Sequence, residues 1–389
     1  MDYYTPPVIP MSLPDLTGTE RQAVMDVINS SYLSFGPKIA EFEKAFTRFT
    51  GSKHAIAVNS GTSGLHLCVR AAGIGAGDYV ITTPFSFVAS ANCILFEKAV
   101  PVFVDVDPAT GNINPKLAAE AARDLAEGGR AAQRWLPRSG SAANGRLKAL
   151  LAVDVYGQPA DYDALRSITD TYDLGLIEDS CEALGSAYKG RNTGTLGDTG
   201  VFAFYPNKQI TTGEGGLVVT SDDSMAEMML ALRNQGRAPG DTWLQHTYLG
   251  YNYRLDEMSC ALGAAQMARI EELLAKRSQV AAWYHQRLQS IDGIDAPVLV
   301  ENTSAVSWFV YVTRLHAGIS RDEVAQKLKN MGIPVRPYFS PIHLQPYMVD
   351  QFGYRAGDFP VTEDLGERSM ALPFSGVMDE AQVEQVCSA

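Results

Sequence analysis

The chain has 389 residues, which exceeds the usual size of one domain and favours two domains that share a cleft. Hydrophobic residues make up 46% of it and charged residues 20%, a globular composition that excludes wholesale disorder. The net charge is −12, from 32 basic and 44 acidic residues, and a surface of this sign repels a nucleic-acid backbone. No run of 18 apolar residues and no signal-peptide pattern is found, and the five cysteines form no C-x-x-C pair. We therefore expect a cytoplasmic protein that binds neither membrane nor nucleic acid.

Short apolar runs alternate with amphipathic stretches over the first 250 residues. The runs are rich in valine and isoleucine and predict strands at 54–58, 79–82, 100–104, 147–155 and 175–177. Helices are predicted between them, for example at 64–72 and 160–172. This alternation predicts an α/β fold, with a mainly parallel sheet covered by helices on both faces. Two further strands, 200–204 and 216–220, are too close for a crossover helix, so we expect them to be antiparallel or locally irregular.

The last third of the chain predicts a second, smaller α/β unit. Leu273, Val280 and Tyr284 recur at helical spacing in a stretch that predicts one long helix over 257–290. A strand at 307–315 and a helix at 322–331 follow, and Gly332 closes that helix. We therefore expect a large domain at 1–250 with a short N-terminal arm, and a smaller domain at 251–389 led by the long helix. The segment 127–145 has no period and is expected to be an exposed insertion that could be mobile.

The stretch from Asn59 to Gly64 follows a predicted strand and opens a helix. Backbone amides at a helix N-terminus, with Ser and Thr hydroxyls beside them, form a site suited to a phosphate group. The alternative is a capped helix with a glycine turn and no ligand.

Two further residues could carry chemistry. Asp179 ends a predicted buried strand, where ligands sit in open α/β sheets, and its carboxylate could pair with a protonated ring nitrogen of a pyridoxal cofactor. The alternative is an aspartate that caps a helix. Lys208 follows another strand, among aromatic residues and ahead of a glycine-rich turn, and an enclosed lysine can form a Schiff base with an aldehyde. A solvated surface lysine is the alternative.

Five stretches of the sequence together resemble one family. Nearly the whole chain, from Leu33 to Tyr338, is similar to the nucleotide-sugar aminotransferases of the DegT/DnrJ/EryC1/StrS family, which have the fold of type I pyridoxal-phosphate enzymes. The stretches are Asn59-Ser-Gly-Thr-Ser63, Pro84-Phe-Ser-Phe-Val-Ala-Ser-Ala-Asn92, Glu178-Asp-Ser-Cys-Glu-Ala183, Asn207-Lys-Gln209 and Gly250-Tyr-Asn-Tyr-Arg-Leu-Asp-Glu257.

The resemblance implies roles for individual residues. Lys208 would be the Schiff-base lysine that holds the cofactor as an internal aldimine, and Asp179 the partner of its pyridine nitrogen. The other positions would hold the cofactor's phosphate, ring face and phenolic oxygen: Gly61, Thr62 and Ser63 as the phosphate cradle, Phe87 on the ring face, and Glu182 beside the phenolic oxygen. Asn252 would reach the neighbouring subunit's phosphate site, which requires a homodimer. Arg254 is either part of that segment or a structural arginine paired with Asp256 or Glu257.

The resemblance also has departures and less specific positions. Ala203 stands where many members have a serine that helps hold the phosphate, and Asp154 stands at the cleft edge where a histidine is common. Tyr338 and His343 lie in a stretch that borders the sugar site, although a lone histidine is more often an ordinary hydrogen-bonded residue. The cysteines are interpreted as packing residues.

The reaction implied by the resemblance is transfer of an amino group, with glutamate as the expected donor, to a keto group of a nucleotide-linked deoxysugar. Ping-pong kinetics and a role in polysaccharide biosynthesis would follow. The first rival is a sugar dehydratase on the same scaffold, but those enzymes have histidine in place of the lysine. The second rival is a regulator that binds the cofactor without catalysis, which would predict loss of the lysine or the acid.

Overall fold

The computed structural model describes residues 9–140 and 145–389 of the chain. Within them, the central sheet has seven strands in the order β1-β9-β8-β5-β4-β2-β3. Their bounds are β1 His54–Val58, β2 Tyr79–Thr82, β3 Val100–Phe103, β4 Leu147–Val153, β5 Gly175–Asp179, β8 Thr199–Ala203 and β9 Gly216–Thr220. The pairs β3/β2, β2/β4, β4/β5 and β5/β8 are parallel. The pairs β8/β9 and β9/β1 are antiparallel, so the expected antiparallel pairing of the two late strands is confirmed.

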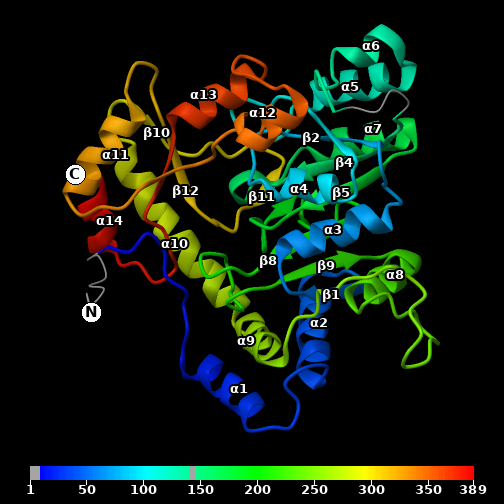
Figure 1. Cartoon of the computed structure of the whole chain (residues 1–389). Coiled ribbons are helices and arrows are strands. Elements are labelled where there is room, and N and C mark those ends of the chain that lie inside the picture. The colour runs from blue at the N-terminus through cyan, green and yellow to red at the C-terminus, as the bar shows by residue number, and fades with distance from the viewer. Residues whose placement is uncertain (1–8, 141–144) are drawn as a thin grey trace.

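Helices cover both faces of this sheet (Figure 1). Leu151 packs in one cluster with side chains of α3 (Gly61–Ala71), α4 (Ala89–Phe96) and α8 (Asp223–Arg233). Its strand neighbours Leu150 and Ala152 point to the opposite face, toward α5 (Pro115–Glu127) and α7 (Tyr162–Tyr172). On that face, β8 and β9 pack against α2 (Pro37–Thr50) and α9 (Glu257–Met267). Because both faces are buried, the strands are mostly apolar, as the valine- and isoleucine-rich runs predicted.

Two smaller sheets complete the β structure of the described residues. An antiparallel sheet in the order β10-β12-β14-β13 packs against α10 (Ile270–Leu288), α11 (Arg321–Asn330) and α14 (Glu380–Cys387). Its strands are β10 Ile294–Asp295, β12 Tyr311–Leu315, β13 Arg336–Pro337 and β14 Ser369–Leu372. The third sheet has the order β11-β6-β7, with the strands β11 Thr303–Ala305, β6 Ala187–Tyr188 and β7 Arg191–Asn192. The remaining elements are the helices α1 Gly18–Ile28, α6 Gly129–Gln133, α12 Pro346–Phe352 and α13 Pro360–Arg368 and the 3-10 turns Val155–Gly157 and Ile342–Leu344. The domain boundary after residue 250 stays a prediction.

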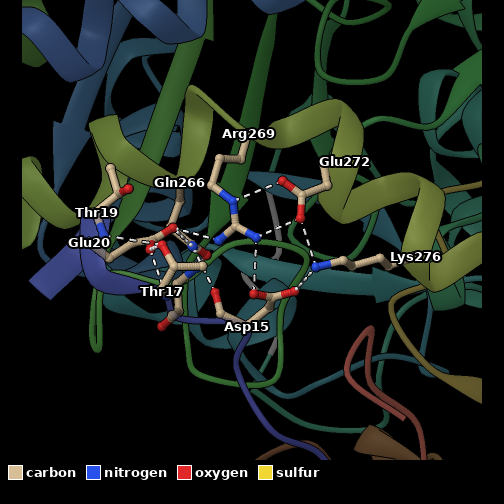
Figure 2. A network of polar contacts seen from close by, with 9 residues as sticks. Asp15, Thr17, Thr19, Glu20, Gln266, Arg269, Glu272 and Lys276 are labelled. Atoms are coloured by element: carbon tan, nitrogen blue, oxygen red, sulfur yellow. Dashed lines mark hydrogen bonds and ion pairs between the residues drawn. The ribbon is translucent and has the colours of Figure 1, made fainter. Parts of the chain in front are cut away.

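The single helix expected over 257–290 is two helices, α9 and α10, and the prediction of one helix is wrong. The chain leaves the helical path at Arg269 (φ −116°, ψ 13°). The side chain of Arg269 there pairs with Asp15, Glu20 and Glu272, and Lys276 also pairs with Asp15. Figure 2 shows this arginine at the centre of the network, which joins α1 and the segment before it to the junction of α9 and α10.

Two other predicted segments differ from the structure. The strand expected at 307–315 begins only at Tyr311, because Trp308 has a positive φ of 52° that ends extended backbone. The described part of the segment 127–145 is mostly exposed, as predicted, but it contains regular structure and buried contacts. It forms α6, buries Ala132, and lets Trp135 Nε1 donate a 2.8 Å hydrogen bond to Asp124. Residues 141–144 lie outside the described residues.

Candidate active site

A cavity of about 350 Å³ lies at the carboxyl ends of the parallel strands. Val153, Asp179 and Ala203 are the last residues of β4, β5 and β8, and all three line it. Most of the residues singled out in the sequence line the same cavity, namely Gly61, Thr62, Phe87, Asp179, Glu182, Lys208 and Tyr338. The fold therefore brings together, in one place, side chains that are spread over 278 positions of the chain, from 61 to 338.

The N-terminus of α3 forms one end of this cavity. Ser60 caps the helix by accepting a 3.1 Å hydrogen bond from the Ser63 amide, so the predicted capping is present. Ser63 does not line the cavity, because its hydroxyl donates to Asn59 Oδ1 at 2.7 Å. The amides of the first turn of a helix have no partner within the helix, and two residues of this turn, Gly61 and Thr62, line the cavity. A helix end placed this way attracts an anion.

Glycine is required at two positions beside this helix end. A Cβ on Gly61 would lie 2.8 Å from the Ala203 Cβ and 3.0 Å from the Cys181 Sγ. A Cβ on Gly216 would lie 2.5 Å from the carbonyl carbon of Ser60. The turn before α3 thus packs directly on the ends of β8 and β9, which fixes the helix end at the cavity.

Asp179 lies on the buried wall of the cavity, with 5% of its surface exposed. Burial raises the pKa of its carboxyl, while hydrogen bonds from Cys181 and the charge of Lys208 lower it. The Cys181 amide donates to Asp179 Oδ1 at 3.3 Å, but no helix begins at this turn. The interpretation of Asp179 as a helix cap is therefore wrong, and its carboxylate faces the cavity.

Lys208 is enclosed, with 13% of its side chain exposed, so the interpretation as a surface lysine is wrong. Its Nζ lies 3.7 Å from the centre of the Phe309 ring and 3.7 Å from Glu182 Oε1. Glu182 Oε2 accepts a 3.0 Å hydrogen bond from the Tyr156 amide. Burial raises the pKa of Glu182 to about 7, against the lowering effect of the Lys208 charge.

Some predicted residues do not line this cavity. His343 is completely buried, and its Nε2 lies 3.0 Å from Glu363 Oε1. Asn252 is exposed at the surface, and its carbonyl accepts a hydrogen bond from Asn59 Nδ2 at 3.4 Å.

Arg254 does not pair with Asp256 or Glu257, so that interpretation is wrong. Its Nη1 donates to Asn234 Oδ1 at 3.2 Å and its guanidinium lies 5.3 Å from the Phe35 ring centre. The two acids are used elsewhere: Asp256 caps α9, and Glu257 accepts from the first amides of α2.

Asp154, the position at the cleft edge where family members often have a histidine, does not line the cavity. It is fully buried and accepts hydrogen bonds from Tyr162 Oη at 2.8 Å and Ser180 Oγ at 2.7 Å. Ser180 Oγ also lies 3.0 Å from Glu178 Oε1. Burial and the nearby Glu178 raise the pKa of Asp154 well above its usual range, which fits a shared network of structural hydrogen bonds beneath the sheet edge.

Sequence reasoning missed several residues of the cavity wall. Phe309, Phe339, Asn207 and Glu214 line it. The Oδ1 atom of Asn207 is buried without a hydrogen-bond partner in the structure. Asn207 had a signal as a neighbour of Lys208, and Phe339 had one because it lies in the stretch that resembles the border of the sugar site. Phe309 had none, since it lies in the strand predicted at 307–315. A second cavity, of about 240 Å³, is lined by Tyr156 and Arg314 and by none of the predicted site residues.

Comparison with known proteins places the chain in a family. The model of the DegT/DnrJ/EryC1/StrS aminotransferase family matches residues 14–389. The chain belongs to this family. It is 37% identical over 388 residues to a GDP-perosamine synthase of Caulobacter vibrioides, covering 98% of this chain and 97% of the relative.

Solved structures of family members have the same fold. DesV of S. venezuelae, solved in complex with a ketimine intermediate, is 31% identical, with a TM-score of 0.86 and coverage of 99% and 97% of the two chains. PseC of Helicobacter pylori, an aminotransferase involved in the biosynthesis of pseudoaminic acid, is 28% identical, with a TM-score of 0.86 and coverage of 98% and 97%. The expected fold of a type I pyridoxal-phosphate enzyme is confirmed.

The cofactor of this family of aminotransferases is pyridoxal phosphate, and the cavity fits it. The helix end of α3 matches a phosphate, Asp179 matches a protonated ring nitrogen, and Lys208 matches an aldehyde. A side chain at Gly61 would collide with Ala203 and Cys181, so glycine at this position lets the end of α3 lie against the end of β8 at the cavity. In residues 9–140 and 145–389 no group of three or more acidic, cysteine or histidine side chains could hold a metal ion. None of the helices in those ranges is both long and apolar enough to cross a membrane.

Proposed function

We propose that this aminotransferase moves an amino group from L-glutamate to a keto group of a nucleotide-linked deoxysugar, with ping-pong kinetics. One observation carries the chemistry: Lys208, Asp179 and the N-terminus of α3 line the same cavity. The sugar substrate is supported by the relatives, which include a GDP-perosamine synthase and an enzyme of pseudoaminic acid biosynthesis.

Asp179 would set the electronic state of the cofactor. Pyridoxal phosphate supplies an electron sink for the carbanion that forms when a proton leaves the amino acid's α carbon. A carboxylate that is buried and faces the ring nitrogen keeps a proton on that nitrogen. Phe87, at the cavity mouth, would cover the ring face, and Glu182 would lie beside the phenolic oxygen.

The phosphate would be held by the amides of Gly61 and Thr62 and by the Thr62 hydroxyl. Ala203 offers no hydroxyl at the neighbouring strand end, and Ser63 uses its own hydroxyl on Asn59. We therefore propose that Ser63 does not bind the phosphate itself. Its amide donates to Ser60 Oγ, which fixes the shape of the first turn of α3.

Lys208 would move the proton between the substrate's α carbon and the cofactor carbon that carries the amino group. It is suited to this because its Nζ is enclosed, between the Phe309 ring and Glu182, and lines the same cavity as Asp179. Tyr338 would form part of the sugar wall. His343 would reach a substrate only after its hydrogen bond to Glu363 breaks, so we retain only Tyr338 in this role.

The active site would be completed by a second subunit in a homodimer. Asn252 is exposed rather than directed into its own cavity, as expected of a residue that reaches a neighbour's site. Exposed apolar side chains lie in the preceding segment and at the cavity mouth, including Trp243 and Leu249, which are 78% and 84% exposed, and Phe87. We assign these side chains to the proposed contact between subunits, where they would be removed from water. The thiols of all five cysteines are free, which supports the proposed cytoplasmic location.

The rivals are disfavoured by residues that are retained. The dehydratase would have histidine at position 208, and a regulator would have lost the lysine or the acid, whereas both Lys208 and Asp179 line the cavity.

The test is an absorbance spectrum of the purified protein with pyridoxal phosphate, before and after glutamate, followed by assays on a panel of 3-keto and 4-keto sugar nucleotides. We expect a yellow band that glutamate removes, and transfer of nitrogen to at least one sugar. The Lys208→Ala variant should lack the lysine-linked band. A wild-type protein that forms no such band would refute the role of Lys208.

A further inference from the structure

A buried arginine lies beside the lysine segment, and sequence reasoning gave it no role. Arg277 of α10 has 4% of its surface exposed. Among the described residues it has no carboxylate partner. Its donors go instead to three main-chain carbonyl oxygens: Nε to Trp308 at 2.9 Å, and Nη2 to Phe309 at 2.8 Å and to Asn207 at 3.1 Å.

This arrangement is costly for stability alone. Burial of a charged group without an opposite charge is unfavourable, and here burial lowers the pKa of Arg277 to about 10. The guanidinium is held by the three carbonyls and by the Phe374 ring, whose centre is 5.3 Å from Cζ. An apolar side chain would fill the same place without a desolvated charge, which points to a positional role for the hydrogen bonds.

The three carbonyls belong to the two segments that surround the reactive amine. Asn207 directly precedes Lys208 in the chain, and the ring of Phe309 lies 3.7 Å from Lys208 Nζ. Trp308 precedes Phe309 and has a positive φ of 52°, so its backbone needs support to keep this conformation. One rigid, planar guanidinium therefore holds two parts of the backbone: Asn207, which precedes Lys208, and Trp308–Phe309, whose Phe309 ring contacts the Lys208 amine.

We propose that Arg277 is a positioning residue that holds Lys208 in place for its bond to the cofactor. The inference rests on the proposed function of Lys208. In that step the Lys208 amine attacks the aldehyde carbon of pyridoxal phosphate, a carbon–nitrogen double bond forms, and one water molecule leaves. The side chain of Arg277 does not line the cavity and would act only through the two segments that it joins.

The test compares covalent capture with non-covalent binding. The full-length protein, freed of cofactor, is mixed with pyridoxal phosphate, and the rate of capture is followed by absorbance and by mass spectrometry after borohydride fixes the bond. Affinity for pyridoxamine phosphate, an amine that needs no bond to Lys208, is measured on the same samples. The variants are Arg277→Lys, which keeps the positive charge but loses the planar guanidinium with its several N–H donors, and Arg277→Met, which loses both.

We expect capture in Arg277→Lys to be about 10- to 100-fold slower, with pyridoxamine phosphate affinity within about twofold of the wild type. Arg277→Met should be slower still. The matched control is Arg321→Lys, since Arg321 donates to the Gly366 and Ser369 carbonyls, outside the cavity of Lys208, and should change neither quantity.

The outcomes separate this inference from the proposed function. Capture at the wild-type rate in folded Arg277→Lys overturns the inference, and so does an equal loss of capture and of pyridoxamine phosphate affinity. Absence of capture in the wild-type protein instead overturns the role of Lys208. Where Arg277→Met does not fold, as judged by circular dichroism, Arg277→Lys alone decides.

Discussion

At the scale of single residues, the site depends on charged groups that are kept out of water. Lys208, Asp179 and Glu182 are all largely buried. The charge of Lys208 lowers the pKa of both acids, and the charge of Asp179 raises the pKa of Glu182. Burial favours the neutral form of each acid, and the positive lysine favours the charged form. For Glu182, these opposing effects leave a pKa of about 7, near neutral pH.

The Glu182 carboxyl predicts a specific pH dependence. Its pKa in the folded protein, about 7, lies above the ordinary value of 4.5, so its contribution to stability is complete below pH 4.5 and is lost as the pH rises through 7. That difference corresponds to about 3 kcal/mol. We expect Glu182→Gln to remove this loss, so that the variant gains stability over the wild type between pH 5 and 8.5. Denaturant unfolding of both cofactor-free proteins at the two pH values measures it, and parallel pH profiles would contradict the assignment.

At the scale of elements, the predictable part of the structure is the part that has a strong local pattern. The buried strands β1, β2 and β9 were predicted within their exact bounds, because continuous apolar runs ended by turn residues leave few alternatives. The break between α9 and α10 could not be predicted, because it coincides with contacts of Arg269 to Asp15 and Glu20, about 250 positions away in the chain.

The site shows the same division. Asp179 and Lys208 stand in recognisable stretches at strand ends, whereas Phe309 and Arg277 reach the site only through tertiary packing. The direction of the Asp154 side chain could not be predicted for a related reason: its position in the chain is beside the cleft, but its side chain turns to Ser180 and Tyr162.

The close packing at the N-terminus of α3 predicts that adding one methyl group at Gly61 changes both stability and cofactor binding. In Gly61→Ala the added Cβ would contact Ala203 at 2.8 Å, so the helix end must move. We expect a loss of unfolding free energy of about 1–3 kcal/mol and weaker binding of pyridoxamine phosphate. Gly75→Ala is the matched control, since nothing lies within 4 Å of its Cβ, and it should change neither. Unaltered cofactor affinity in Gly61→Ala would show that the helix end does not hold the phosphate.

The network at the junction of α9 and α10 predicts acid sensitivity. Burial opposes ionisation of Glu20, but hydrogen bonds from Thr17, Arg269 and Gln266 outweigh it and lower the pKa of Glu20 from 4.5 to about 2. The resulting stabilisation, about 3 kcal/mol, is present above pH 4.5 and is lost as the pH falls toward 2.

The variant Glu20→Gln should therefore be less stable than the wild type at pH 6. The difference between their free energies of unfolding, called the gap below, should be smaller at pH 3. Denaturant unfolding at both values measures this. Glu41→Gln, which removes only an exposed ion pair with Lys38, is expected to have little effect. A gap that stays constant with pH would contradict the ionised state of Glu20.

At the scale of the whole molecule, the proposed dimer makes each active site a product of two chains. Asp179, at the end of β5, and Lys208, on the loop after β8, line a cavity whose mouth exposes Phe87, and Asn252 lies outside that cavity on the surface. If Lys208 of one subunit and Asn252 of the other serve the same site, dimers that combine two different variants should behave differently from either variant alone.

Mixing two inactive variants should restore activity. In a hybrid of Lys208→Ala and Asn252→Ala subunits, one site keeps its own lysine and receives an intact asparagine from its partner. We expect random hybrids to show about a quarter of wild-type activity, because half of the dimers are mixed and each has one complete site. Assays after co-refolding, beside each variant alone, measure this. No recovery in verified hybrids would place Asn252 in its own subunit's site or outside any site.

The most direct test of the central claim is a half-reaction. The protein loaded with pyridoxal phosphate is given glutamate with no keto sugar, and the 2-oxoglutarate released is counted per subunit. The account predicts one equivalent per subunit, retained nitrogen on the protein-bound cofactor, and no measurable release on the same timescale from the Lys208→Ala variant. Release of no 2-oxoglutarate by the wild type, or equal release by the variant, would contradict aminotransfer through Lys208.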